Sequence, residues 1–407
     1  MLEVIAMIDW LLVLYGASDV LHNEIEVGGL NVNDQYVPEV FFSETRNAQQ
    51  DEFAREMAAL RLGIGVAEED KLDNPLTDVE FLRKLDAAFL THLGFTYLDF
   101  LKVLSTLINW VGVGGGTEFA FTYEASANDI ALAAVRAHEG LSESVALRAI
   151  DFLILVPAGI RRLAGRGEDT KDVPVWEHTK RVERFTIKPL IMLPAGQLLW
   201  GASMAERSRR IWMGSISAGY LPADYSWAAV REVVGKAKKD IEDGLEDAAH
   251  AVCARMTPYA VKGLDFMDRF PKEGFSDVGD FDLLAYWPEG NRWLIGECKY
   301  NQPVFCVKDT RRLRDRVFGG GSEPGQFVKI ERRRKFFAEN IELIRQLLTW
   351  PTPTTTAPEV TEIYICKDLH WWLRFPPYEV PTKFSQIDTF GAWLATSGFV
   401  AAHASAP

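Results

Sequence analysis

The sequence is poor in cysteine and has no long hydrophobic run. Its four cysteines are widely spaced and form no Cys-x-x-Cys pair: Cys253, Cys298, Cys306 and Cys366. This pattern implies neither a zinc ribbon nor a disulfide framework, and it fits a reducing cytoplasm, where we expect the protein. No stretch of about eighteen apolar residues is present, so we expect no contact with a membrane. The apolar start carries Glu3 and Asp9, whereas a signal peptide begins with basic residues.

Several common catalytic motifs are also missing. The sequence has no Gly-x-Ser-x-Gly elbow, so serine hydrolysis has no support. A glycine-rich stretch at residues 112–117 lacks the Gly-Lys-Ser/Thr ending of a P-loop. The histidines are scattered, and no pair has the helical spacing of metal ligands. These absences argue against serine hydrolases, P-loop nucleotide binding and histidine-based metal sites.

The chain is long for a single domain at 407 residues. A Leu-Pro-Ala-Asp linker at residues 221–224 precedes a long amphipathic pattern. We therefore expect a mainly helical N-terminal region over residues 1–225 and a second domain over residues 226–407. In the first region, apolar periodicity predicts helices at about 47–62, 78–90, 95–111, 127–138 and 142–155. Its expected role is to select a substrate, a protein partner or an activation state.

The most informative part of the second region is a pair of β-strand patterns. Residues 279–284 and 293–299 both read as strands, and residues 287–291 (Trp-Pro-Glu-Gly-Asn) can turn the chain between them. Side chains alternate between the two faces of a strand. If the two strands pair antiparallel, charged side chains from both meet at one edge of the sheet: Asp280, Asp282, Glu297 and Lys299.

Such a cluster of charges is costly unless a cation compensates the carboxylates. Mg²⁺ does this well, because it prefers carboxylate, carbonyl and water oxygens. A Glu-x-Lys pair on an exposed strand is usually only a solvated charge pattern. Here Glu297 and Lys299 continue the apolar face of Trp293 and Ile295, where a solvent-facing pattern is not expected.

The flanking patterns give the order of elements. A helix over about 230–256 precedes a strand within 259–267, and a helix over 337–348 precedes a strand at 360–366. With the two central strands, the order is helix–strand–strand–strand–helix–strand. This order predicts an α/β core with a mixed sheet covered by helices, in a chain that is α+β overall.

These residues resemble a known family. Asp282 together with Glu297-x-Lys299 is similar to the signature of the PD-(D/E)XK phosphodiesterases, which are restriction endonuclease-like proteins. The resemblance covers roughly residues 226–370 and implies a restriction endonuclease-like αβββαβ core. It also implies that Asp282 and Glu297 bind Mg²⁺, with Mn²⁺ as a substitute, and that Lys299 assists the attacking water. The backbone carbonyl of Cys298 is then a further metal ligand.

In the resembled family, a helix before the first strand often supplies another acidic residue to the site. Glu246 lies at the border of the apolar stripe of the predicted helix and is our candidate, with Glu242 in reserve. The alternative is that both are surface charges of the helix.

A basic segment follows the second central strand. Residues 299–335 hold eleven Lys or Arg against four Asp or Glu, a charge of +7 in a chain at −13, which leaves −20 for the rest. Such a segment suits the phosphate backbone of a nucleic acid, with a flexible glycine loop at residues 319–321. The alternative is a solvated arginine-rich helix and loop. The candidate phosphate-binding residues are Arg311, Arg312, Arg314, Arg316, Lys329, Arg332, Arg333, Arg334 and Lys335.

Together these features predict a Mg²⁺-dependent nuclease acting on DNA. By analogy with the family, restriction, phage defence or repair is its expected setting. Two alternatives stay open, namely an RNA-cleaving enzyme with the same site and a non-catalytic nucleic-acid-binding or scaffold protein that keeps the fold. A protein partner for the N-terminal region and an oligomeric state are compatible with each of these.

Overall fold

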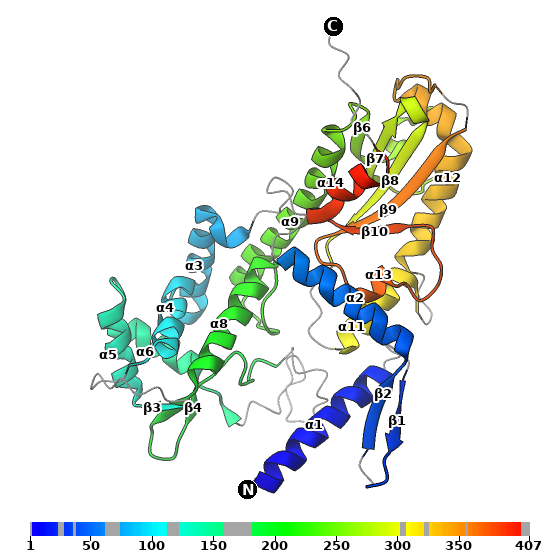
Figure 1. The fold of residues 1–407 in the computed structure, drawn as a ribbon. Coiled ribbons are helices and arrows are strands. Elements are labelled where there is room, and N and C mark those ends of the chain that lie inside the picture. Colours follow the sequence, from blue (N-terminus) through cyan, green and yellow to red (C-terminus); the bar gives the residue numbers. More distant parts are fainter. Residues whose placement is uncertain are drawn as a thin grey trace. The chain divides into compact units, whose positions relative to one another are not determined.

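The computed structural model describes residues 2–22, 28–35, 38–61, 74–111, 122–157, 181–301, 307–320, 325–354 and 357–399. It is a mixed α/β structure that forms two compact units, whose elements are labelled in Figure 1. One unit comprises residues 73–241, and the other combines residues 1–72 with 242–407. The domain boundary expected near residue 225 precedes the long helix α9 (Ala228–Ala254), whereas the compact units divide within this helix.

A five-stranded sheet is the centre of the discontinuous unit. Its strands lie in the order β10-β9-β8-β7-β6, with antiparallel pairing among β6, β7 and β8 and parallel pairing among β8, β9 and β10. The mixed sheet expected from the sequence is therefore present. The strand bounds are β6 Ala260–Leu264, β7 Phe281–Trp287, β8 Arg292–Lys299, β9 Glu359–Cys366 and β10 Lys383–Gln386.

The hairpin of β7 and β8 forms as its sequence predicts. A short 3-10 turn over Pro288–Gly290 connects the strands, and Asn291 takes the left-handed conformation that asparagine tolerates well (φ 47°). Leu283 pairs with Gly296 and Leu284 with Ile295, which fixes the register. All of β7 and nearly all of β8 is buried, because other strands pair on both sides of the hairpin.

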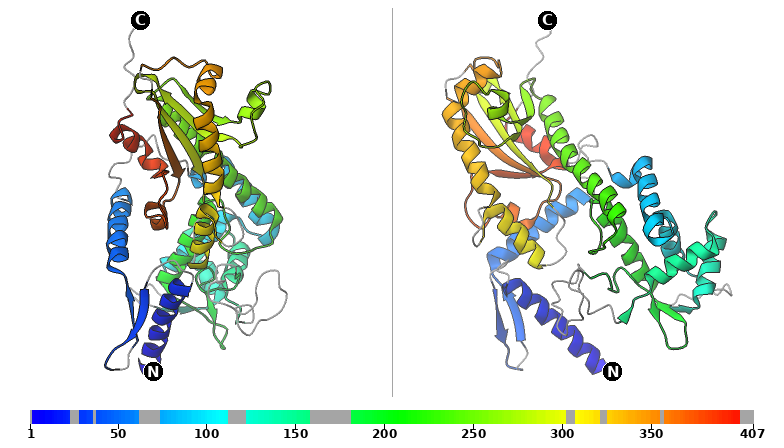
Figure 2. Two further views of the ribbon diagram at one scale, coloured as in Figure 1. Left: turned by 90° about the vertical axis from the view of Figure 1, so that its right-hand side faces the viewer. Right: turned by 180° about the vertical axis from the view of Figure 1, so that it is seen from behind.

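Helices cover both faces of this sheet. Helix α12 (Gln326–Leu347) packs on one face, where the ring centroids of Phe337 and Trp293 lie 5.1 Å apart. Helix α14 (Ile387–Thr396) packs against β9 and β10 from the opposite side (Figures 1 and 2). The predicted helix over 337–348 is the second half of α12. The shorter helices of this part are α10 Phe266–Arg269, α11 Val307–Phe318 and α13 Trp371–Arg374.

The N-terminal residues belong to the same unit. An antiparallel hairpin of β1 and β2 lies between α1 and α2, with the bounds α1 Leu2–His22, β1 Gly28–Val32, β2 Pro38–Phe42 and α2 Glu44–Arg61. Phe53 of α2 packs against the core cluster that contains Trp372. Arg374 of α13 pairs with Glu52 and Glu56 of α2. The sequence predicts α2 as a helix, but its partner α13 lies more than 300 residues later and could not be inferred.

The continuous unit is built mainly from helices. Its core centres on Trp212, whose ring contacts those of Phe89, Phe100 and Phe152. Ser142 caps the N-terminus of α6 as predicted, because its hydroxyl accepts from the backbone N–H of Val145. A small sheet has the order β3-β5-β4. The bounds are α3 Val79–Leu93, α4 Tyr97–Ile108, β3 Tyr123–Ala125, α5 Ala127–Ala137, α6 Glu143–Leu153, β4 Ile191–Met192, β5 Leu198–Trp200 and α8 Ala202–Ser217.

Gly296 offers a test of the central hairpin. A Cβ added at this position would lie 2.9 Å from Leu283 Cβ, which is closer than real Cβ contacts allow. We therefore expect Gly296→Ala to destabilise the protein by about 1–3 kcal/mol in urea unfolding followed by tryptophan fluorescence. Gly244→Ala is the control, because an added Cβ there meets nothing within 4 Å. A glycine inside a helix lowers the stability of the fold by about 0.5–1 kcal/mol relative to alanine, so this variant should not be destabilised. An unchanged urea unfolding midpoint for Gly296→Ala would contradict the pairing of Gly296 with Leu283.

Candidate functional site

The structure brings three of the predicted residues together. Asp282 is the second residue of β7, and Glu297 and Lys299 lie at the end of β8. Because the strands are antiparallel, the start of β7 lies beside the end of β8. The ammonium of Lys299 lies 2.8 Å from Asp282 Oδ2 and 2.9 Å from Glu297 Oε1. The lysine therefore bridges the two carboxylates.

Burial makes this group electrostatically strong. The side chain of Asp282 is only 3% exposed, whereas that of Lys299 is 31% exposed. Burial raises the pKa of Asp282, and the charge of Glu297 raises it further, against the opposing effect of Lys299. Burial alone would lower the pKa of Lys299, but Glu297 and Asp282 outweigh it and raise that pKa. Lys299 is therefore an ammonium at neutral pH, suited to donate hydrogen bonds and to stabilise negative charge.

The backbone between Glu297 and Lys299 fixes the aspartate. The N–H of Cys298 donates to Asp282 Oδ2 at 2.7 Å, so this oxygen accepts two hydrogen bonds from β8. The thiol of Cys298 is buried, and burial followed by the charge of Asp282 raises its pKa well above the usual range. The thiol is therefore not a reactive group, and the metal-ligand role of the Cys298 carbonyl stays a prediction.

Arg333 belongs to the site and not to an exposed basic surface. It lies on α12, is 7% exposed, and donates to Glu297 Oε2. Its Nη1 also donates to the backbone carbonyl of Asp280 at 2.9 Å. Sequence reasoning placed Arg333 among the phosphate-binding residues and missed these contacts. The available signal was its helical spacing, since Arg333 lies three residues after Ile330 and four before Phe337, both on the buried side of α12.

The weaker acidic candidates take different positions. Glu246 on α9 is half-buried, and burial followed by the charge of Asp282 raises its pKa. It therefore lies within electrostatic range of the site, although no hydrogen bond joins it to Asp282, Glu297 or Lys299 in the parts of the chain described. Glu242, the reserve candidate, lies one turn earlier on α9. Asp280 is exposed just before β7 and contributes its carbonyl to Arg333.

A further buried acid, Glu362, was missed. It lies on β9 in register with Ile295, accepts from the hydroxyl of Thr382, and has Arg334 Nη1 at 3.6 Å. Burial is the main reason that the pKa of Glu362 is raised. Glu362 was hard to predict, because it is the only charged residue within an apolar strand pattern at 360–366. Buried acids on this face of the sheet therefore occur on β7, β8 and β9.

The basic residues lie on two helices, and several already have acidic neighbours. Arg311 and Arg314 pair with Asp315 at 3.5 and 3.6 Å, and Arg312 lies 3.9 Å from Asp309. The expected loop at 319–321 falls at the end of α11, and residue 321 lies outside the described residues. Of the nine predicted phosphate-binding residues, five are exposed: Arg312, Arg316, Lys329, Arg332 and Lys335.

The donor set of the site is small but suits a hard cation. Within the described ranges, no group of three or more His, Cys, Asp or Glu side chains is arranged to hold a metal. Mg²⁺ needs fewer side chains than this, because it usually keeps several waters and one or two carboxylates. Asp282 and Glu297 supply two carboxylates that already share one cation, the ammonium of Lys299. The residues therefore fit Mg²⁺ if the flexible lysine head moves aside.

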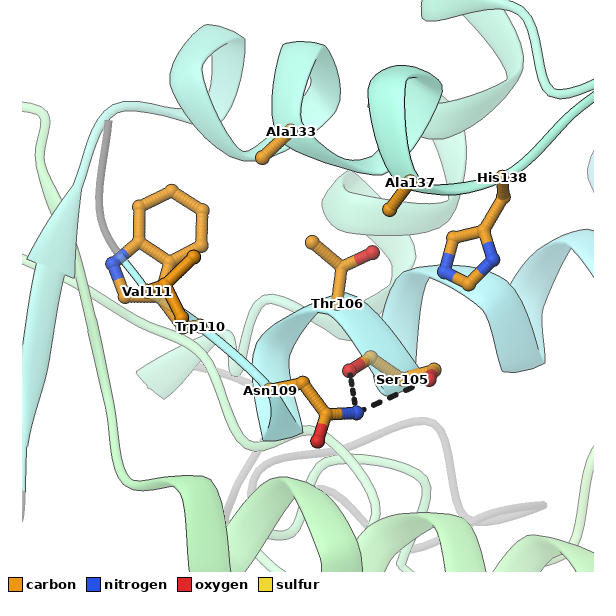
Figure 3. Close-up of a pocket in the computed structure, with 8 residues that line it drawn as sticks. All are labelled: Ser105, Thr106, Asn109, Trp110, Val111, Ala133, Ala137 and His138. Atoms are coloured by element: carbon orange, nitrogen blue, oxygen red, sulfur yellow. Dashed lines mark hydrogen bonds between the residues drawn. The ribbon is translucent and has the colours of Figure 1, made fainter. Parts of the chain in front are cut away.

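A separate cavity lies in the unit of residues 73–241. It has a volume of about 170 Å³ between α4 and α5 (Figure 3). Asn109 Nδ2 donates to the carbonyl of Ser105 at 2.9 Å along its wall. Among the described residues that line this cavity, none carries a carboxylate. The lining residues are Ser105, Thr106, Asn109, Trp110, Val111, Ala133, Ala137 and His138.

Comparisons with protein families, curated proteins and solved structures find no match to this chain. Within the ranges that the structure describes, no helix combines the length and apolar character needed to cross a membrane. We therefore infer the function from the geometry of the site and from the fold around it.

The buried position of Cys298 allows the site strand to be tested directly. We expect Cys298 to resist alkylation by iodoacetamide in the folded protein, because its thiol is both buried and protonated. Peptide mass spectrometry after labelling with and without urea measures this. Rapid labelling of Cys298 in the folded protein, at the rate seen in urea, would contradict the described end of β8.

Proposed function

We propose that the protein is a Mg²⁺-dependent nuclease that hydrolyses phosphodiester bonds in DNA. The observation that carries the proposal is the bridge of Lys299 between Asp282 and Glu297 at the ends of two buried strands. Burying two carboxylates side by side is costly, and functional sites are where such groups concentrate. A cation-binding role accounts for both their burial and their pairing.

The fold supports the same proposal. Apart from the short helix α10 and the basic helix α11, the chain runs α9, β6, β7, β8, α12, β9, which resembles the αβββαβ order of restriction endonuclease-like proteins, and the sheet is mixed. The paired residues are those of the PD-(D/E)XK resemblance. A setting in restriction, phage defence or repair follows from this resemblance by analogy.

The residues divide the chemistry among them. Asp282 and Glu297 would hold Mg²⁺, with the carbonyl of Cys298 as a further ligand. When bound, Mg²⁺ supplies charge stabilisation at the phosphate and acidifies a coordinated water. Lys299, released from the carboxylates, donates a hydrogen bond that orients the water or stabilises a phosphate oxygen. The N–H of Cys298 keeps Asp282 oriented throughout.

The exposed basic residues favour a phosphate polymer as the substrate. Five exposed cations on α11 and α12 follow the site strand in sequence and belong to the same unit. Lys and Arg bind phosphate backbones by releasing condensed counterions. RNA is the alternative substrate, since these contacts to phosphate do not require or exclude a 2′-hydroxyl.

One observation favours a second candidate function. Lys299 and Arg333 together balance the charges of Asp282 and Glu297, so these four groups are electrically neutral without a metal. Such a site could stabilise a non-catalytic nucleic-acid-binding protein that keeps the fold. This candidate predicts binding of DNA without cleavage at any concentration of Mg²⁺.

Cleavage of supercoiled plasmid separates the two candidates. We expect nicking or linearisation with Mg²⁺ and none with EDTA. Lys299→Ala should lower the rate of cleavage by at least about 100-fold while it retains metal binding. Asp282→Ala should lose both cleavage and metal binding. Lys383→Ala, an exposed lysine on β10, is the matched control and should cut like the parent. Equal cutting by the parent and both site variants would show that the proposed site is wrong.

The exposed basic residues make a separate prediction about binding. In the cleavage-deficient Lys299→Ala background, Arg332→Gln with Lys335→Gln should weaken binding of a DNA duplex. The slope of log K against log salt should fall by about two, because each cation contributes about one released counterion. Fluorescence anisotropy over a salt series measures the slope. An unchanged slope would place the nucleic acid elsewhere.

A further inference from the structure

Arg333 reaches Glu297 from outside the β7–β8 hairpin, whereas its neighbour Arg334 lies beside Glu362. The guanidinium of Arg333 holds Glu297 Oε2 with one nitrogen and the carbonyl of Asp280 with another. Lys299 takes the other oxygen of Glu297. Both oxygens of Glu297 are therefore occupied by protein cations, and Arg333 ties α12 to β8 and to the residue just before β7.

This arrangement has a consequence for charge. Asp282 and Glu297 carry two negative charges, and Lys299 and Arg333 carry two positive ones. A divalent cation must therefore enter a site that is already neutral and must displace hydrogen bonds to charged groups. Lys299 can move, because its head is part-exposed on a flexible stem. The guanidinium of Arg333 is buried and held at two points, so it stays and opposes the incoming cation.

We propose that Arg333 is a positioning residue that orients Glu297 and, as a resident counter-cation, keeps the affinity of the Asp282–Glu297 pair for divalent metal low. The inference rests on the proposed function, because it concerns the same metal site. Arg333 acts through Glu297 and is not itself a catalytic residue. A purely structural arginine would affect folding but would not oppose the binding of a cation.

The test uses Mn²⁺ binding to the full chain at fixed pH, measured from the electron paramagnetic resonance signal of free Mn²⁺. Arg333→Met removes the opposing charge, and we expect its Kd for Mn²⁺ to fall about tenfold, or about 1.4 kcal/mol. Arg333→Gln serves the same purpose and retains a donor for the carbonyl of Asp280. Arg333→Lys keeps the charge and should stay within about twofold of the parent.

Two controls complete the design. Lys383→Met removes one positive charge at an exposed position of β10, so it measures the effect of overall charge and should stay within about twofold of the parent. Asp282→Ala removes one of the proposed metal ligands, so the Mn²⁺ binding that this variant loses is the binding at the site. Circular dichroism and a thermal melt test whether each variant is folded. If Arg333→Met is not folded, the comparison uses Arg333→Gln alone.

The outcomes are distinct. Tighter binding in the neutral Arg333 variants, with no such change in Arg333→Lys or Lys383→Met, supports the inference. Equal or weaker binding in those variants, with binding still lost in Asp282→Ala, overturns the role of Arg333 and leaves the proposed nuclease site in place. Absence of Asp282-dependent Mn²⁺ binding in every variant overturns the metal site, and the inference fails with it.

Discussion

The bridge of Lys299 between Asp282 and Glu297 is the interaction on which the rest of the account depends. It places opposite charges at the ends of two strands that are otherwise buried among apolar side chains. A buried charge left without a partner is strongly destabilising, so each of the three groups requires the others. The hairpin register brings them together, and the buried N–H of Cys298 and guanidinium of Arg333 then fix where the carboxylates point.

This balance also explains how one site can be both stable and suited to chemistry. The carboxylates are held by cations of unequal mobility, because Lys299 is part-exposed and Arg333 is buried. In the proposed function, Lys299 moves aside to admit a divalent ion, whereas Arg333 stays and sets how tightly that ion binds. The exposed cations of α11 and α12 add attraction for a phosphate polymer.

Much of the site was predictable because it is local. The strand pair, its turn at 287–291 and the shared face of Glu297 and Lys299 follow from alternation and turn chemistry over about twenty residues. The roles of Arg333 and Glu362 were missed because their partners come from distant strands and helices. In addition, a single charged residue within an apolar pattern does not indicate on its own that its side chain is buried. The discontinuous unit was missed for the same reason, since the contact of α2 with α13 joins residues over 300 positions apart.

The most direct test of the central claim is a crystal structure with Mn²⁺ and a short DNA duplex, with the metal located from its anomalous signal. We predict a metal peak at about 2.1 Å from oxygens of both Asp282 and Glu297, close to the distance usual for Mg²⁺. Lys299 should then have turned away from the carboxylates toward a backbone phosphate or a water. A metal bound elsewhere, or DNA bound with the Lys299 bridge intact and no metal peak, would contradict it.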